Sequence, residues 1–312
     1  MELIFLQPIF KERLWGGHKL KTDYGYHITS NHTGECWAIS AHANGETRVK
    51  NGEFAGMPLS LLWSSHPELF ANNKPRPFPL MVKILDANDD LSVQVHPDDN
   101  FAQLVENDLG KAECWYVLDA KPEAKIIYGH TALTSEEFRQ LAQAGEWKSL
   151  LQEVPVKRGD FFDVPTGTVH ALGAGSLILE VQQSSDTTYR LYDYDRRDNN
   201  GNLRELHLDK AFAVIKAPHQ NKDDQLESRN LGLDTIFTSL TSNEHFQVGK
   251  LEINGDLELN ITSPYLLISV IDGAAALNGQ EIKKGDHFIV PNPVRKVKIS
   301  GNVTLIVSNE VA

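Results

Sequence analysis

The chain has 312 residues, of which 41% are hydrophobic and 23% are charged, a composition that is typical of one or two globular domains and excludes a disordered or fibrous chain. Its formal net charge of −12 argues against nucleic acid or an anionic membrane as a partner, although an anionic small molecule can bind where basic residues gather in one pocket. We expect no membrane span and no signal peptide, and two cysteines make no disulfide framework, so a reducing cytoplasm is the expected setting.

Short strand signals dominate the sequence. Segments rich in β-branched or aromatic residues and bounded by turn-forming residues predict strands at residues 91–96, 114–118, 125–128, 177–183, 265–271 and 303–308. Capping residues and apolar periodicity predict fewer helices, at residues 56–71, 98–110, 134–150 and 208–216. Short strands with a few inserted helices favour a β-sandwich or barrel over an alternating α/β fold.

Two features suggest two β-domains. The polar stretch 219–230 contains one aliphatic residue and reads as a linker or long loop. Residues 156–165 (VKRGDFFDVP) are echoed by residues 282–291 (IKKGDHFIVP), and only the first copy continues to a histidine, His170. A duplicated β-fold with one chemically active copy explains this echo, and chance similarity between two β-turns is the alternative. We therefore predict a catalytic domain at residues 1–230 and a C-terminal β-domain at residues 231–312.

Four candidate metal ligands, Gln94, His96, Glu113 and His170, are predicted to meet in the first domain. The two-residue period of a strand places Gln94 and His96 on one face, and Lys111 and Glu113 on one face of another strand. His170 follows a proline–glycine turn that presents its imidazole at the start of a strand. Imidazole and carboxylate ligands that leave one position open suit a catalytic Zn²⁺, and Fe²⁺, Mn²⁺ or Co²⁺ would accept the same ligands.

The sequence resembles the cupins at these positions and, over most of its length, the short bacterial type I mannose-6-phosphate isomerases. The segments that carry the resemblance are residues 14–17 (LWGG), 34–40 (GECWAIS), 92–99 (SVQVHPDD), 111–116 (KAECWY), 165–170 (PTGTVH) and 184–190 (SSDTTYR). The resemblance implies jelly-roll β-sandwiches of the cupin type and one Zn²⁺ per chain. It also implies that Gln94, His96, Glu113 and His170 are metal ligands and that Arg190 is the catalytic arginine.

The residue types agree with the implied reaction, in which mannose 6-phosphate and fructose 6-phosphate interconvert through an enediol. Such an isomerisation needs an acid/base group, an electrophile at the carbonyl oxygen and an anchor for the phosphate. Arg190 suits the phosphate or an enediolate oxygen, and Lys111 adds positive charge beside Glu113. Glu180 is the candidate for an acid/base group outside the ligand set, or else an ion-pair partner that orients Arg190.

The sequence is also compatible with two other functions. One is a cupin isomerase or epimerase that acts on another phosphosugar, and the other is a sugar-binding cupin without catalysis. The joint presence of a ligand set, Arg190, Lys111 and Glu180 favours an enzyme, because a binding module needs no titratable group beside an open metal. The sequence gives no oligomeric state.

Overall fold

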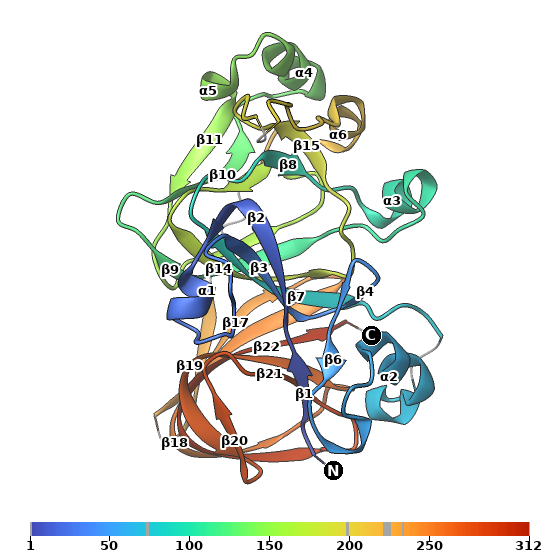
Figure 1. The fold of residues 1–312 in the computed structure, drawn as a ribbon, viewed down its shortest axis with the longest axis vertical. Coiled ribbons are helices and arrows are strands. Elements are labelled where there is room, and N and C mark those ends of the chain that lie inside the picture. The colour runs from blue at the N-terminus through green and yellow to red at the C-terminus, as the bar shows by residue number, and fades with distance from the viewer. Residues whose placement is uncertain (1, 73–74, 198–199, 221–225, 233, 312) are drawn as a thin grey trace.

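The computed structural model describes residues 2–72, 75–197, 200–220, 226–232 and 234–311. Within these residues the strands form sheets of nine, six, five and two members. Figure 1 shows two β-rich halves stacked along the long axis, with most of the helices at the periphery. The predicted mainly-β fold with a few inserted helices is confirmed. No helix among the described residues is long and apolar enough to cross a membrane.

The upper half contains two sheets. The six-stranded sheet has the order β12 (Phe161–Val164), β9 (Glu113–Ala120), β14 (Ser176–Gln183), β7 (Leu80–Ala87), β2 (Ile9–Gly17), β3 (Thr33–Ile39). The five-stranded sheet has the order β11 (Leu151–Pro155), β10 (Lys125–His130), β13 (His170–Leu172), β8 (Val93–Val95), β15 (Tyr189–Tyr192). Side chains of both sheets share one core, which includes Leu85 and Trp115 from the first and Ile126 and Leu172 from the second.

The opposite face of the six-stranded sheet packs on the lower half, where Ile84 and Leu179 share a second core with Leu267 and Ile306. Every residue of β7 and β14 is therefore buried, as in sheets that are covered on both faces. A charged residue in these two strands is largely removed from bulk water and needs a partner inside the protein.

The lower half is one curled sheet with its own apolar core. Its order is β16 (Glu227–Gly232), β17 (Thr235–Ser242), β18 (Phe246–Asn260), β22 (Lys296–Glu310), β19 (Leu266–Leu277), β21 (His287–Val290), β1 (Ile4–Gln7), β6 (Arg48–Val49), with β20 (Gln280–Lys283) paired to β19. The N-terminal strand β1 thus completes the C-terminal sheet. A small hairpin of β4 (Ala41–His42) and β5 (Gly45–Glu46) stands apart from these sheets.

The helices are short. They are α1 (Lys19–Thr22), α2 (Leu59–Ser65), α3 (Asp99–Val105), α4 (Ser135–Gln143), α5 (Trp147–Leu150) and α6 (Leu208–Val214), with 3₁₀ turns η1 (Gly52–Phe54) and η2 (Pro67–Phe70). Asp98 caps α3 by accepting a hydrogen bond from the backbone of Phe101, and Thr134 caps α4 in the same way. The single helix predicted at residues 134–150 is wrong, because Gly145 adopts a φ of +75° and separates α4 from α5. The segment 56–71 likewise divides before Pro67 into α2 and η2.

The predicted linker at residues 219–230 is wrong at its C-terminal end. Residues 227–230 belong to β16, which pairs antiparallel with β17. Polar side chains are compatible with a strand here because every residue of β16 is exposed. Residues 221–225 of the predicted linker lie outside the described residues, and the domain boundary at residue 230 stays a prediction.

Candidate active site

Three candidate ligands meet between the two sheets of the upper half. His96 follows β8 directly and His170 begins β13, so both come from the five-stranded sheet. Glu113 begins β9 in the facing six-stranded sheet. One ligand atom of each residue lies within 4.8 Å of those of the other two. The distances from Glu113 oxygens are 3.4 Å to His96 Nε2 and 3.3 Å to His170 Nε2.

The two imidazoles are oriented as metal-binding imidazoles are. The Nδ1 of His96 lies 3.0 Å from the carbonyl oxygen of Thr187, and the Nδ1 of His170 lies 2.9 Å from that of Thr168. A carbonyl only accepts, so each Nδ1 carries the proton and each Nε2 turns a lone pair toward the cluster. Burial lowers the pKa of His96 to about 3 and also lowers that of His170. Both side chains are therefore neutral at pH 7, as metal binding requires.

The carboxylate of Glu113 completes the cluster. It is fully buried, and neither oxygen accepts a hydrogen bond of normal geometry. Burial alone would raise the pKa of Glu113, but Lys111 and the two histidines lower it well below its ordinary value, so the group stays ionised. A buried carboxylate that is paired with one lysine and is faced by two imidazole lone pairs fits a divalent cation. The predicted ligand Gln94 also lies here, with its Nε2 3.3 Å from His170 Nε2.

Lys111 lies at the edge of this cluster. Its Nζ is 2.9 Å from a Glu113 oxygen and 3.0 Å from His96 Nε2. Burial would lower the pKa of Lys111, but the carboxylates of Glu113 and Glu180 outweigh burial and raise it. The strand periodicity thus predicts the meeting of Lys111 with Glu113 correctly. Lys111 also lines the adjacent cavity, so its charge faces both the cluster and the space beside it.

That cavity has a volume of about 310 Å³, enough for a small polar molecule. Its described basic lining residues are Arg13, Lys83, Lys111, Arg190 and Arg204, and its acidic ones are Glu35, Glu180 and Asp186. Positive charge therefore exceeds negative charge in this cavity, although the whole chain carries a net charge of −12. Such a local excess suits an anionic ligand.

Arg190 is held in the wall of the cavity by β15. Its Nε donates to the Ser92 hydroxyl at 3.1 Å, and its Nη1 donates to the Glu205 carbonyl at 2.7 Å. Burial and the nearby Arg204 lower the pKa of Arg190 from its usual high value. An arginine remains cationic after such a shift. The guanidinium is thus fixed in position on the side of the cavity that the five-stranded sheet provides.

Glu180 lies across the cavity on β14, directly opposite Lys83 of β7 and Trp115 of β9. Its carboxylate is 3.5 Å from Lys83 Nζ and accepts a hydrogen bond from Trp115 Nε1 at 3.1 Å. Burial raises the pKa of Glu180, and the charge of Glu113 raises it further. Among the described residues Glu180 and Arg190 share no ion pair, so the alternative of Glu180 as the ion-pair partner of Arg190 is wrong.

Sequence reasoning missed part of this site. The strand and ligand patterns do not single out Lys83, yet it is 5% exposed and lines the cavity. The sequence does indicate that Lys83 is buried, because it is the one lysine inside an otherwise apolar run (LMVKIL). Arg13 and Arg204 carried no comparable signal, since only the tertiary fold brings them to the cavity.

The fold and the site together define a class of protein, a β-sandwich with a candidate metal centre beside a cationic cavity. Comparison with known proteins then gives the family. The model for the catalytic domain of type I phosphomannose isomerase matches residues 3–141, and the model for the cupin domain of mannose-6-phosphate isomerase matches residues 235–310. The chain is 49% identical to mannose-6-phosphate isomerase ManA of Bacillus subtilis, over 99% of each chain, and 48% identical to mannose-6-phosphate isomerase of Streptococcus mutans, over 99% and 98%.

A solved structure agrees. The crystal structure of mannose 6-phosphate isomerase from Bacillus subtilis superimposes with a TM-score of 0.96 at 44% identity, covering 99% of this chain and 100% of that one. The chain belongs to the type I phosphomannose isomerase family. The predicted cupin-type fold is confirmed, as is the prediction that the chain is an aldose–ketose isomerase of this family.

Proposed function

We propose that the chain interconverts mannose 6-phosphate and fructose 6-phosphate through an enediol, with one Zn²⁺ held by His96, Glu113, His170 and Gln94. The observation that carries the proposal is the buried His–Glu–His cluster beside a cavity with excess positive charge. The bound ion would supply Lewis-acid polarisation of the sugar oxygens. The names of the relatives supply the substrate.

In this proposal, Arg190 and Lys111 stabilise the negative charge of the phosphate and of the enediolate oxygen. Arg190 is already fixed by Ser92 and Glu205, so little reorganisation is needed when its guanidinium meets a phosphate or enediolate oxygen. Lys111 stays protonated because Glu113 and Glu180 raise its pKa. Its ammonium group can therefore stabilise an oxygen that becomes negative during enolisation.

Glu180 is the proposed acid/base group. Its raised pKa brings a carboxyl closer to neutral pH, where a group that both takes and returns a proton is effective. Lys83 and Trp115 hold the carboxylate in place from the two neighbouring strands. The proton moved between C1 and C2 of the sugar would pass through the Glu180 carboxylate.

The proposed chemistry belongs to one of the two predicted domains. All the proposed site residues fall between Gln94 and Arg190, within the predicted catalytic domain of residues 1–230. The predicted domain at residues 231–312 would hold no metal. The two cysteines, Cys36 and Cys114, are free and buried, which supports the proposed setting in a reducing cytoplasm.

A coupled assay for fructose 6-phosphate formed from mannose 6-phosphate tests the function. Turnover should be present in the holoenzyme, fall on exhaustive chelation, and return when Zn²⁺ is added. Glucose 6-phosphate, the C2 epimer, is the matched control substrate and should turn over far more slowly. Faster turnover of another phosphosugar would favour the alternative isomerase or epimerase. Saturable binding of mannose 6-phosphate without any turnover would favour the non-catalytic sugar-binding cupin.

A further inference from the structure

The lower half repeats a turn of the active-site half in detail. In the segments 157–160 and 283–286 the backbone amide of the first residue, a lysine, donates to the side chain of the aspartate at 2.9 Å. The glycine before each aspartate has a positive φ, +93° and +90°. The echo between residues 156–165 and 282–291 is therefore a repeated structure, and strand pairing around the two turns can be compared residue by residue.

The first comparison concerns the metal ligand on β9. The strand after the first turn, β12, pairs with β9 so that Val164 lies opposite Glu113. The strand after the second turn, β21, pairs with β19 so that Val290 lies opposite Leu266. Val164 and Val290 occupy the same place in the two copies. Leu266 therefore stands where the active-site half has the carboxylate of Glu113.

The second comparison concerns the proposed acid/base group. On the other side of β9, strand β14 places Glu180 opposite Trp115, two residues after Glu113. On the corresponding side of β19, strand β22 places Val307 opposite Ile268, two residues after Leu266. Val307 therefore stands in the place of Glu180. Both acidic positions of the site are aliphatic in the second copy.

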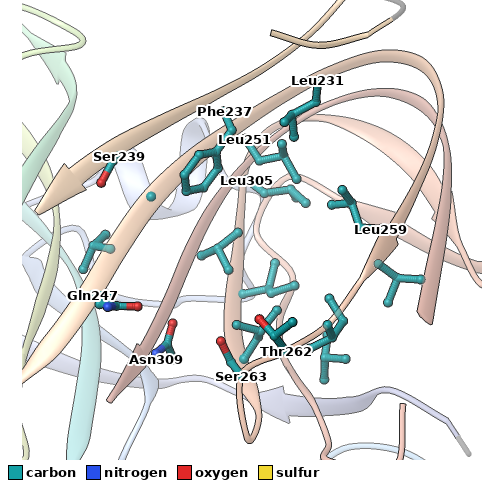
Figure 2. A pocket seen from close by; sticks show the side chains of 18 of the residues that line it. Leu231, Phe237, Ser239, Gln247, Leu251, Leu259, Thr262, Ser263, Leu305 and Asn309 are labelled. Atoms are coloured by element: carbon teal, nitrogen blue, oxygen red, sulfur yellow. The ribbon is translucent and has the colours of Figure 1, made fainter. Parts of the chain in front are cut away.

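These replaced positions line a second cavity. Leu266, Ile268, Val290 and Val307 all line a space of about 470 Å³. Figure 2 shows this space inside the curled C-terminal sheet. Among the described residues that line it, only Arg229 is charged, and Arg229 is exposed on β16. The cavity thus occupies the place of the active-site cavity in the repeated fold, but its chemistry is apolar.

The lining of the cavity is polar at one end. Figure 2 shows Gln247, Asn309 and Ser263 toward one end, whereas Leu231 and Leu251 lie toward the other. A volume of this size, an apolar wall and a few polar groups at one end are typical of a site for a small molecule. A charged group would lose its hydration among these side chains with little in return.

We propose that the C-terminal domain holds a second ligand site, which takes an uncharged amphiphile with an apolar chain or ring and one hydrogen-bonding end. The apolar part packs on Leu251 and Leu305, and the polar end reaches Gln247 and Asn309. This site is separate from the active site and does not depend on its proposed chemistry.

The test uses N-phenyl-1-naphthylamine, an uncharged aromatic probe whose fluorescence rises in apolar surroundings, titrated into the full chain. We expect one saturable site per chain, displaced by 1-decanol and unaffected by mannose 6-phosphate. Val307→Phe and Leu259→Trp fill the cavity from different strands and should each weaken binding at least tenfold. Ile236→Phe adds the same ring as the first variant at an exposed position of β17 outside the cavity lining and should bind like the parent.

Circular dichroism and thermal unfolding identify the folded variants, and Leu259→Trp decides alone if Val307→Phe does not fold. Absence of a saturable site in the parent would overturn the proposal, as would parental affinity in a folded cavity variant. The sulfonated analogue, 8-anilinonaphthalene-1-sulfonate, has the same ring system with a charge. We expect it to bind at least tenfold more weakly, and equal binding would overturn the assignment of an uncharged ligand.

Discussion

Lys83→Met tests whether the buried charges of Lys83 and Glu180, in the six-stranded sheet, stabilise one another. Lys83 and Glu180 face each other on β7 and β14 with their charged groups 3.5 Å apart and side chains 6% and 4% exposed. Methionine keeps most of the aliphatic length of lysine and removes its charge. Glu180 then remains as a buried carboxylate that has lost its ion-pair partner and keeps only the nearby charge of Lys111. Loss of one partner of a buried ion pair typically destabilises a protein by ~3–5 kcal/mol, and the remaining charge of Lys111 places the expected loss at the lower end of this range.

The expected shift in melting temperature follows from the size of the chain. An unfolding entropy of ~2.1 cal/mol/K per residue gives roughly 650 cal/mol/K for 312 residues. A loss of ~3 kcal/mol therefore lowers Tm by roughly 5 °C. Differential scanning calorimetry of the metal-loaded protein measures this shift directly.

The loss should depend on pH in a defined direction. The pKa of Glu180 is already raised in the folded protein by burial, and removal of Lys83 raises it further. Near the ordinary glutamate pKa of 4.5 the carboxyl is protonated in parent and variant alike, so the difference in stability is small. As pH rises above that value the variant must ionise a buried carboxyl that has lost its ion pair with Lys83, so the loss of stability grows toward pH 8.

Two further variants control this experiment. The double variant Lys83→Met/Glu180→Gln removes both charges and should recover most of the lost stability. Lys125→Met breaks an exposed pair with Glu153, whose side chains are 56% and 58% exposed, and should leave Tm almost unchanged. The reasoning would be refuted if Lys83→Met lost the same stability at pH 5 and pH 8 and if the loss of the double variant equalled the sum of the losses of its two single variants.

Three other predictions concern the metal, the arginine and the cysteines. His170→Ala should lose the single bound metal ion, whereas His287→Ala should retain it by elemental analysis, because His287 lies in the second copy and contacts Tyr26 and Ser269 instead. Arg190→Ala should keep its metal while kcat and kcat/KM fall together by about 10²-fold, and Arg190→Lys should recover only part of the activity, since lysine lacks the planar fork. Cys36 and Cys114 should react with a thiol reagent only after unfolding, because burial raises the pKa of both thiols.

Local sequence patterns predict much of the site because its residues obey strand periodicity. The alternation of Gln94 with His96 and of Lys111 with Glu113 places each pair on one face, and the structure brings both pairs to the same cluster. The same patterns could not show which strands are neighbours. The partner of Glu180 is Lys83, nearly one hundred residues earlier, because β7 and β14 pair in the sheet.

Helix boundaries and the predicted linker show a second limit of prediction from sequence patterns. Residues 134–150 have the cap and the apolar face of one helix, but the left-handed conformation of Gly145 ends α4. Residues 227–230 look like a linker because their side chains are polar. They form a strand nevertheless, since backbone pairing with β17 requires no buried face.

The position of the six-stranded sheet between two cores explains how an acidic protein can present a cationic cavity. In β7 and β14 both faces are covered, so the charges of Lys83 and Glu180 are only weakly screened by water. Lys111, two residues before the neighbouring strand β9, is equally buried and faces Glu113. Charges in such surroundings act on a ligand a few ångströms away far more strongly than distant surface carboxylates do. Local placement of a few buried lysines and arginines, and not the net charge of −12, therefore determines which ligand the cavity accepts.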